Sequence, residues 1–200
     1  MTIRRSRCTD LGQLLVASLL FAAPGLARAA GGTITGKVDV TPPKYTEETV
    51  VYLKQVAGQY PHKTATMDQK GMRFLPHVLA ITVGDTVNFA NHDAVAHNVF
   101  SPEGGYNLGT FGPNESRTHV FAKTGTFTQL CSIHPEMLAF IFVGQNPYSA
   151  TVDKAGTYTI TDVPPGTYQI AVWNSHGKAA DQSVTVAEGK TVKVNFLVRK

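Results

Sequence analysis

Short apolar runs rich in Val, Ile, Thr, Tyr and Phe recur along the chain from residue 33 onward. Turn-forming residues such as Gly84-Asp85 and Pro164-Pro165-Gly166 separate them, and no stretch of useful length repeats its apolar positions with a helical period. Closely spaced strands with Gly and Pro between them are typical of β-sandwiches and barrels. The pattern therefore predicts an all-β chain. The predicted strands are Thr33–Val40, Thr49–Leu53, Leu79–Val83, Thr86–Phe89, Arg117–Phe121, Gly125–Leu130, Phe140–Val143, Tyr158–Ile160, Gly166–Trp173, Gln182–Val186 and Thr191–Val198.

The first 29 residues follow a different pattern. Arg4, Arg5 and Arg7 form a basic start, residues 11–26 are apolar, and a small-x-small sequence ends at Ala29. This order is that of a secretory signal peptide, so residues 1–29 are expected to be removed by cleavage near Ala29. Whether export uses the general or the twin-arginine route stays open. No later segment is long and apolar enough for a membrane helix, so the mature chain is expected to have no membrane span.

Removing this leader changes the charge of the chain. The full sequence has 18 Lys and Arg against 14 Asp and Glu. The leader holds four of the cations and one of the anions, which leaves fourteen against thirteen. The basic character thus belongs largely to the leader, and no nucleic-acid partner is expected.

The cysteines are more informative. The sequence has two, and Cys8 lies in the leader, so Cys131 is the one thiol expected in the mature protein. An exported protein meets an oxidising compartment, and Cys131 has no cysteine there to pair with. A lone thiol of this kind is either buried and inert or bound to something.

The strongest chemical signal is the segment Cys131-Ser132-Ile133-His134-Pro135-Glu136-Met137, which directly follows a predicted strand. It supplies a thiolate, an imidazole and a thioether from one short loop, and His97 offers a second imidazole upstream. Two His, one Cys and a weakly bound Met form the ligand set of blue-copper sites. Thiolate and thioether suit Cu(I), while imidazole suits both oxidation states. His97, Cys131, His134 and Met137 are therefore the predicted ligands of one copper ion.

The segment 83–89, with Asn91, Asp93, His97-Asn98-Val99 and Cys131-x-x-His134-x-x-Met137, resembles the amicyanin/plastocyanin group of cupredoxins. The resemblance covers about residues 64–145 and implies a cupredoxin Greek-key β-sandwich with one type 1 copper that carries single electrons. The sequence has no His-x-His pair of the kind that multicopper oxidases need and no second Cys in the ligand loop, so no enzymatic activity is expected. Together with the leader, the resemblance points to the periplasm. It implies redox partners there such as a dehydrogenase or a c-type cytochrome. It also implies that Asn98 ties the His97 strand to the ligand loop.

The stretch from Asn146 onward, with Asp153-x-x-Gly156 and Pro164-Pro165-Gly166, resembles a second family, the transthyretin-like carboxypeptidase regulatory-like domain. The two opening strands of that family have their match upstream, at residues 32–38 and 50–53. Either a copper domain (64–145) is inserted into this small β-sandwich (30–63 with 146–200), or two domains follow in tandem. Tyr168 and Trp173 are expected in the core of the second sandwich.

Other residues and other functions stay in view. His92 and Asp93 are expected to stabilise a turn rather than bind metal. His77 is expected to be a hydrogen-bonded strand residue. No defined site is expected from His62, Met67 and Met72.

A periplasmic copper-binding or copper-delivery protein is the main alternative to an electron carrier. A Cys–His hydrolase and an adhesive β-sandwich are the others.

Overall fold

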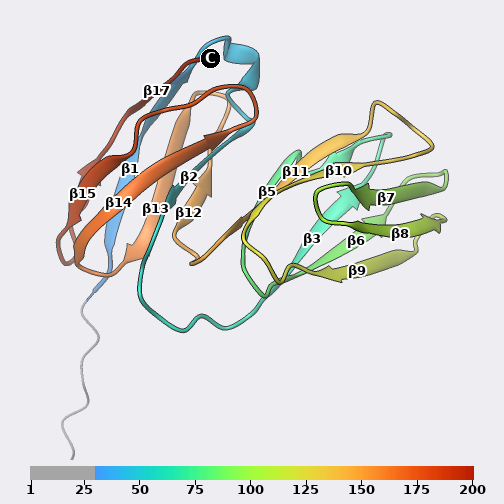
Figure 1. The fold of residues 1–200 in the computed structure, drawn as a ribbon, viewed down its shortest axis with the longest axis horizontal. Helices are drawn as coiled ribbons and strands as arrows, with labels where there is room; N and C mark the ends of the chain where they lie inside the picture. The colour runs from blue at the N-terminus through green and yellow to red at the C-terminus, as the bar shows by residue number, and fades with distance from the viewer. Residues whose placement is uncertain (1–29) are drawn as a thin grey trace, which may run out of the picture.

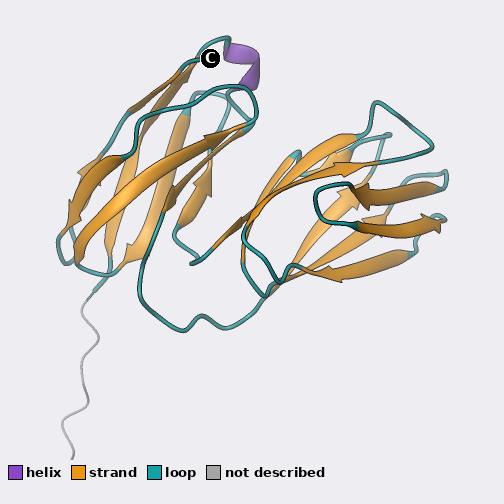
Figure 2. Cartoon of the chain, in the orientation of Figure 1, coloured by secondary structure: helices purple, strands orange, loops and turns teal. Residues whose placement is uncertain are grey.

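The computed structural model describes residues 30–200, so the predicted leader lies outside the described residues. Two lobes lie side by side (Figure 1), and nearly all of their regular structure is strand (Figure 2). Residues from both ends of the described chain form one lobe, here called the terminal lobe. The chain between them forms the other, the middle lobe. The all-β prediction is confirmed, and none of the helices within residues 30–200 has the length and apolarity to cross a membrane.

The terminal lobe is a sandwich of two sheets. One has the order β13-β1-β16 with β17 also on β1, and the other has the order β12-β2-β14-β15. Its elements are β1 (Gly32–Val40), the short 3₁₀ helix η1 (Pro43–Tyr45), β2 (Thr49–Leu53), β12 (Ser149–Thr151), β13 (Thr157–Val163), β14 (Gly166–Asn174), β15 (Gln182–Val186), β16 (Thr191–Lys193) and β17 (Phe196–Val198).

The predicted strand over residues 191–198 is two strands. Both run parallel to β1, with Thr191–Lys193 opposite Thr33–Thr35 and Phe196–Val198 opposite Val38–Val40. Between them, Val194 turns its carbonyl oxygen against Gly36, where a Cβ would lie 1.7 Å from that oxygen. The same oxygen accepts a hydrogen bond from the Tyr158 hydroxyl. The break therefore depends on glycine at position 36, because any side chain there would collide with backbone.

The middle lobe is also a two-sheet sandwich, with the orders β5-β11-β10-β7-β8 and β4-β3-β6-β9. Its strands are β3 (Thr64–Gln69), β4 (Phe74–Leu75), β5 (Val78–Thr82), β6 (Thr86–Asn91), β7 (His97–Ser101), β8 (Tyr106–Phe111), β9 (Ser116–Val120), β10 (Gly125–Leu130) and β11 (Leu138–Gly144). The strand pattern of the sequence did not predict β3, β4, β7, β8 or the terminal lobe's β12. Several of these carry polar residues on buried positions, such as Gln69 in β3 and His97 and Asn98 in β7.

Strands β2, β5 and β11 are apolar on both faces. In β11, Ala139, Ile141 and Val143 point into the core of the middle lobe, whereas Phe140 and Phe142 point the other way, toward the terminal lobe. Strand β5 alternates in the same manner. In β2, Val51 and Leu53 face the core of the terminal lobe while Val50 and Tyr52 face the middle lobe. The four sheets therefore enclose three apolar layers, and the central layer joins the lobes.

Aromatic side chains fill this central layer. The Trp173 ring lies 5.4 Å from that of Phe140 and 6.4 Å from that of Phe142, and Tyr52 lies 4.7 Å from Phe142 on the other side. Tilted rings at such separations attract one another beyond the area that they bury. Trp173 thus contacts the middle lobe rather than lying within the core of its own sandwich, and the prediction for it was wrong. Tyr168 does pack against that core, from a partly buried position.

A polar contact borders the aromatic layer. His77 Nε2 lies 3.2 Å from Glu48 Oε1, and Ser175 Oγ donates to the other oxygen of the same carboxylate. The His77 ring also meets Phe140 edge-on at 5.7 Å. Glu48 and Ser175 belong to the terminal lobe and His77 to the middle lobe, so the contact of His77 with Glu48 adds a hydrogen bond to the apolar packing between the two.

Strand pairing places residues 32–53 with the strands after Asn146. Strand β1 pairs with β13, β16 and β17, and β2 pairs with β12 and β14. The chain passes between the lobes twice, at 54–63 and 145–148. This pairing is what an inserted domain requires. The division into units of 30–63 with 146–200 and of 64–145 stays a prediction, because a division into domains means independent folding.

Residues 64–145 produced alone are expected to fold, because the middle lobe has both of its sheets and its own core. The same fragment exposes Phe140 and Phe142 to water, so it is expected to self-associate. Circular dichroism tests folding and sedimentation tests association. The matched fragment with both phenylalanines changed to Thr should be monomeric. An unfolded fragment would contradict the domain division.

Trp173→Ala is expected to lower the free energy of unfolding of the whole chain by roughly 1–3 kcal/mol. This is less than the cost of deleting a fully buried Trp, because the Trp173 ring is only partly buried. Trp173→Phe keeps an aromatic contact and should cost less. Leu197→Ala, at a position that is 63% exposed, is the control and should change little. Denaturant unfolding followed by circular dichroism measures all three. An alanine variant as stable as the parent would show that the ring does not hold the lobes together.

Candidate metal centre

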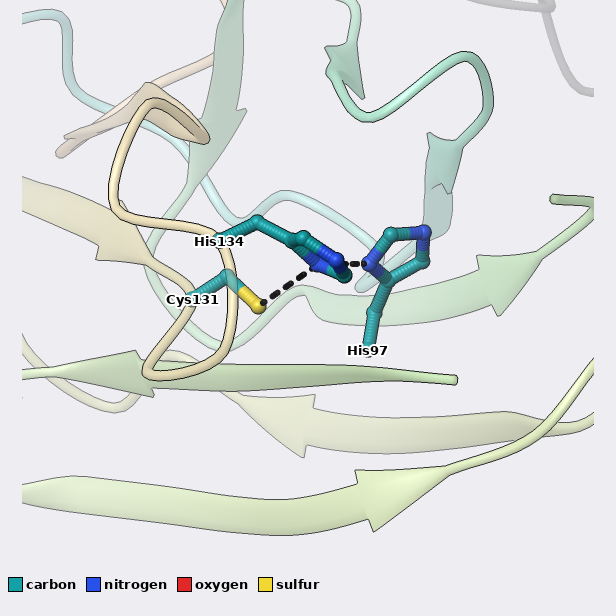
Figure 3. Close-up of side chains that lie close together, drawn as sticks. All are labelled: His97, Cys131 and His134. Carbon is teal, nitrogen blue, oxygen red and sulfur yellow. Dashed lines mark hydrogen bonds between the residues drawn. The ribbon is translucent and has the colours of Figure 1, made fainter. Parts of the chain in front are cut away.

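The predicted ligands lie at one end of the middle lobe. Cys131 directly follows β10, the loop then carries His134 and Met137, and β11 begins at the next residue. His97 opens β7, which pairs with β10 through Phe100 and Leu130. Because neighbouring strands deliver both segments to the same end, His97 meets a loop that lies more than 30 residues later in the sequence (Figure 3).

Three donor atoms converge there. Sγ of Cys131 and one ring nitrogen from each of His97 and His134 all lie within 4.8 Å of one another. The two Nδ1 atoms are 3.0 Å apart, and Cys131 Sγ lies 3.9 Å from His134 Nδ1. A first-row metal with bonds of about 2.0 Å to nitrogen and 2.3 Å to sulfur would hold such atoms roughly 3.3–3.8 Å apart. The donor set therefore fits one metal ion with little movement.

Cys131 is a free thiol and is only 4% exposed. The backbone N–H of Asn98 donates to its sulfur, with N and Sγ 3.4 Å apart. The sulfur is therefore held by β7 as well as by its own strand, and a cysteine thiolate is a metal ligand. The alternative of an inert buried thiol explains neither the N–H nor the two imidazoles beside it.

Met137 is buried, 1% exposed, and belongs to the same apolar cluster as Cys131. Its backbone N–H donates to the carbonyl oxygen of His134 at 3.0 Å, which closes the loop into a tight turn. The Met137 thioether therefore lies inside the lobe, whereas His134 is partly exposed to solvent. Ligation by Met137 stays a prediction.

Asn98 connects the two segments that carry the ligands. Its Oδ1 accepts from the N–H of Ser132 at 3.2 Å, and its Nδ2 donates to Asn107 Oδ1 at 2.8 Å and to the carbonyl of Gly109 at 3.0 Å. The side chain thus spans β7, the ligand loop and β8. The bond to Ser132 is the tie between the His97 strand and the ligand loop that the cupredoxin resemblance implies, and the bonds to β8 were not expected.

Asp93 does more than the turn role expected of it. It accepts from the N–H groups of Met72 and Ala94, and its Oδ2 also lies 3.0 Å from His97 Nε2. The hydrogen bond from Met72 and then that from His97 lower the pKa of Asp93 to about 2. The contact with His97 was missed, since the only sequence signal is a carboxylate four residues before a histidine.

The other candidates lie elsewhere. His92 pairs with Asp68, His77 with Glu48 at the lobe interface, and His62 packs against Gly84. Met67 is buried in the core and Met72 is exposed. Within residues 30–200, the group of His97, Cys131 and His134 is the one set of such side chains close enough to hold a metal.

Exposed apolar side chains gather around this end. Seven large apolar residues are exposed within the described chain, and five of them belong to segments next to the ligands. Ile133 is in the ligand loop, and Met72 and Val95 lie in turns bonded to Asp93 and Asn91. Leu75 and Leu138 line a cavity of about 370 Å³ that also reaches Glu136. The partly exposed His134 lies in the same loop as Ile133.

Comparison with known proteins finds one matching family and a set of similar solved structures. Residues 139–199 match the carboxypeptidase regulatory-like domain family. That match begins inside β11, which pairs with β5 and β10 of the middle lobe, and it does not include β1 or β2. The sequence resemblance to this family is confirmed, and the structure adds the two opening strands at residues 32–53.

The structural neighbours are cupredoxins. A purple cupredoxin from Nitrosopumilus maritimus is 26% identical, with a TM-score of 0.38, over 40% of this chain and 99% of its own. A reduced variant of amicyanin is 26% identical, with a TM-score of 0.38, over 40% of this chain and 81% of its own. A second amicyanin variant, in its Cu(I) form, is 25% identical, with a TM-score of 0.37, over 39% of this chain and 79% of its own.

Asn98→Ala is expected to destabilise the metal-free protein by about 1–3 kcal/mol, because the amide groups of Ser132 and Asn107 and the Gly109 carbonyl lose their partner in a partly buried setting. Denaturant unfolding in the presence of a chelator measures this without any contribution from metal. Ser116→Ala, at an exposed position of β9, is the control. Equal stability of the Asn98 variant and the parent would show that these bonds do not hold the loop.

Proposed function

We propose that this protein is a mononuclear type 1 copper protein that carries single electrons and is not an enzyme. The observation that carries the proposal is the convergence of Cys131 Sγ with the imidazoles of His97 and His134, beside the buried Met137. Soft sulfur ligands together with imidazole favour copper over Mg²⁺ or Ca²⁺. Within residues 30–200 no second ligand cluster accompanies this group, as a multicopper enzyme would require.

Copper bound at such a site supplies a one-electron couple between Cu(I) and Cu(II). The residues of the chain contribute fixed positions: His97 is held by β7, Cys131 by the end of β10, and Asn98 holds their segments together. A site whose side chains are already placed changes little on gain or loss of an electron, which favours rapid transfer. Burial of His97 and Cys131 excludes water and small reactants from most of the site.

The partly exposed His134 provides the contact with a redox partner. It stands among the exposed apolar residues Ile133, Val95 and Met72, so a partner that covers this end buries apolar surface directly over a ligand. We propose periplasmic redox proteins, such as a dehydrogenase and a c-type cytochrome, as donor and acceptor, with export directed by the leader at residues 1–29.

Loading the mature protein with one equivalent of Cu(II) is expected to produce the intense visible absorption of a thiolate–copper bond, and Cys131→Ser is expected to abolish it. His176→Ala removes a histidine that stacks on Tyr45 in the terminal lobe, and it should leave the spectrum unchanged. A parent protein that binds a full equivalent of Cu(II) without this absorption would refute the type 1 assignment.

Copper delivery is the competing function for the same ligands, and copper exchange separates the two. An electron carrier is expected to cycle repeatedly in voltammetry and to keep its metal when mixed with a metal-free acceptor protein. Rapid loss of copper to the acceptor, with the protein still folded, would favour delivery. Failure to bind copper after reconstitution would favour a purely adhesive role.

A further inference from the structure

A cavity of about 390 Å³ lies where the chain passes between the two lobes. Both connections contribute to its wall, the first through Lys54 and Gln55 and the second through Gln145. Strand β2 adds Tyr52 from the terminal lobe, and the middle lobe adds residues 124–126 and 142–144. Small molecules are often bound between lobes, in spaces of roughly 300–1,000 Å³. The cavity has the position and the volume of such a site.

The floor of this cavity is aromatic and its rim is polar. Phe142 is only 6% exposed and Tyr52 is partly buried, and their ring centroids lie 4.7 Å apart. Aromatic rings attract one another in offset or edge-to-face arrangements, so this floor favours a flat ring. The rim consists of the exposed lining residues, which are Lys54, Gln55, Thr124, Gly125 and Gln145.

The Tyr52 hydroxyl is the hydrogen-bond donor of the floor. The hydroxyls of Tyr106, Tyr158 and Tyr168 each donate to a protein oxygen. For the hydroxyl of Tyr52, no such acceptor is found within residues 30–200. Burial raises the pKa of Tyr52, so the phenol keeps its hydrogen at neutral pH. A molecule in the cavity therefore meets a donor that needs an acceptor.

The charges at the rim cancel each other. Lys54 Nζ forms an ion pair with the carboxylate of Asp181, and the two side chains are 45% and 41% exposed. The charge of Lys54 lowers the pKa of Tyr52 and that of Asp181 raises it, so the pair stands near the phenol. A charged ligand would compete with this pair, whereas a neutral ligand leaves it intact.

Strand β10 adds free backbone groups beside the cavity. Strand β7 pairs with β10 only through Leu130, and the N–H of Thr128 donates instead to the Glu103 carboxylate. Backbone groups two residues apart in an antiparallel strand point to the same side. The N–H and C=O of Thr126, which lines the cavity, thus point away from β11 and are available to a ligand.

We propose that this cavity binds a neutral, flat aromatic or heteroaromatic molecule that carries a hydrogen-bond acceptor. Its ring packs on Phe142 and Tyr52, and its acceptor takes the hydrogen bond of the Tyr52 hydroxyl. The site is separate from the proposed function, because none of its residues is a predicted copper ligand. Since the molecule contacts both lobes and both connections, its binding restricts movement of one lobe against the other.

Acetophenone is a suitable probe, because it combines a phenyl ring with a carbonyl acceptor and has no charge. Titrated into the metal-free mature protein, it is expected to shift the NMR amide signals of Thr126 and Gly144 until they saturate. Cyclohexyl methyl ketone has the same carbonyl without an aromatic ring and should bind more weakly. Absence of a saturable shift at these amides would overturn the site. Equal binding of the two ketones would overturn its preference for an aromatic ring.

Tyr52→Phe tests the hydrogen bond, because it removes the hydroxyl and keeps the ring against Phe142. This variant is expected to bind acetophenone about 2–10-fold more weakly, as the loss of one hydrogen bond predicts. Tyr168→Phe is the matched control. It loses a hydroxyl that donates to the Pro164 carbonyl, outside the cavity, and should bind as the parent does.

Circular dichroism shows whether each variant is folded. A folded Tyr52→Phe protein with the parent's affinity would overturn the assignment of Tyr52 as the donor. If this variant does not fold, the comparison of the two ketones on the parent protein still decides whether the cavity binds a flat ring.

Discussion

The burial of β11 on both faces is the constraint on which the rest of the structure depends. Its odd-numbered residues complete the core of the middle lobe, and Phe140 and Phe142 complete the contact with the terminal lobe. The strand also pairs with β10 over its whole length and with β5 on its other side. Since β11 begins at the residue after Met137, every one of these contacts also restrains the ligand loop.

The candidate metal centre follows from that restraint. A loop with its two ends in adjacent, fully paired strands has few conformations, and Asn98 removes more of them by bonding to Ser132. The cost of ordering the ligands is thus met when the protein folds, and little remains to be met when a metal binds. Asp93 adds a further restraint on the far side of the His97 ring, since its Oδ2 lies 3.0 Å from Nε2.

The terminal lobe is more than an appendage of the middle lobe. The chain forms β1 and β2 in this lobe, runs through 95 further residues, and then forms β12, which pairs with β2. Two chain connections and an aromatic layer restrict how far the lobes can move against each other, and the pair of His77 and Glu48 adds an orientation. A partner that contacts the ligand end of the middle lobe therefore finds the terminal lobe in a restricted orientation.

Several features were predictable from sequence because they depend on local chemistry. Alternation and turn residues predicted most of the strands, and the ligand types and their spacing predicted which side chains would gather. The apolar run from Ala139 to Val143, which does not alternate, is the mark of a strand buried on both faces, although it cannot say what covers the second face. The resemblance of residues 32–53 to the opening strands of a small sandwich pointed to the pairing that is observed.

Other features were decided only by tertiary structure. Strands β7 and β8 pair with each other, and β7 joins the sheet through one residue pair with β10. The buried polar residues His97 and Asn98 in β7 have little strand preference of their own. Gly36 splits the last strand through a contact with residue 194, and Trp173 faces the other lobe because β14 carries a core on one face and an interface on the other. The contact between His97 and Asp93 depends on the turn that brings them together. A sequence states which donors exist, whereas the direction in which each donor points is settled when the sheets pack.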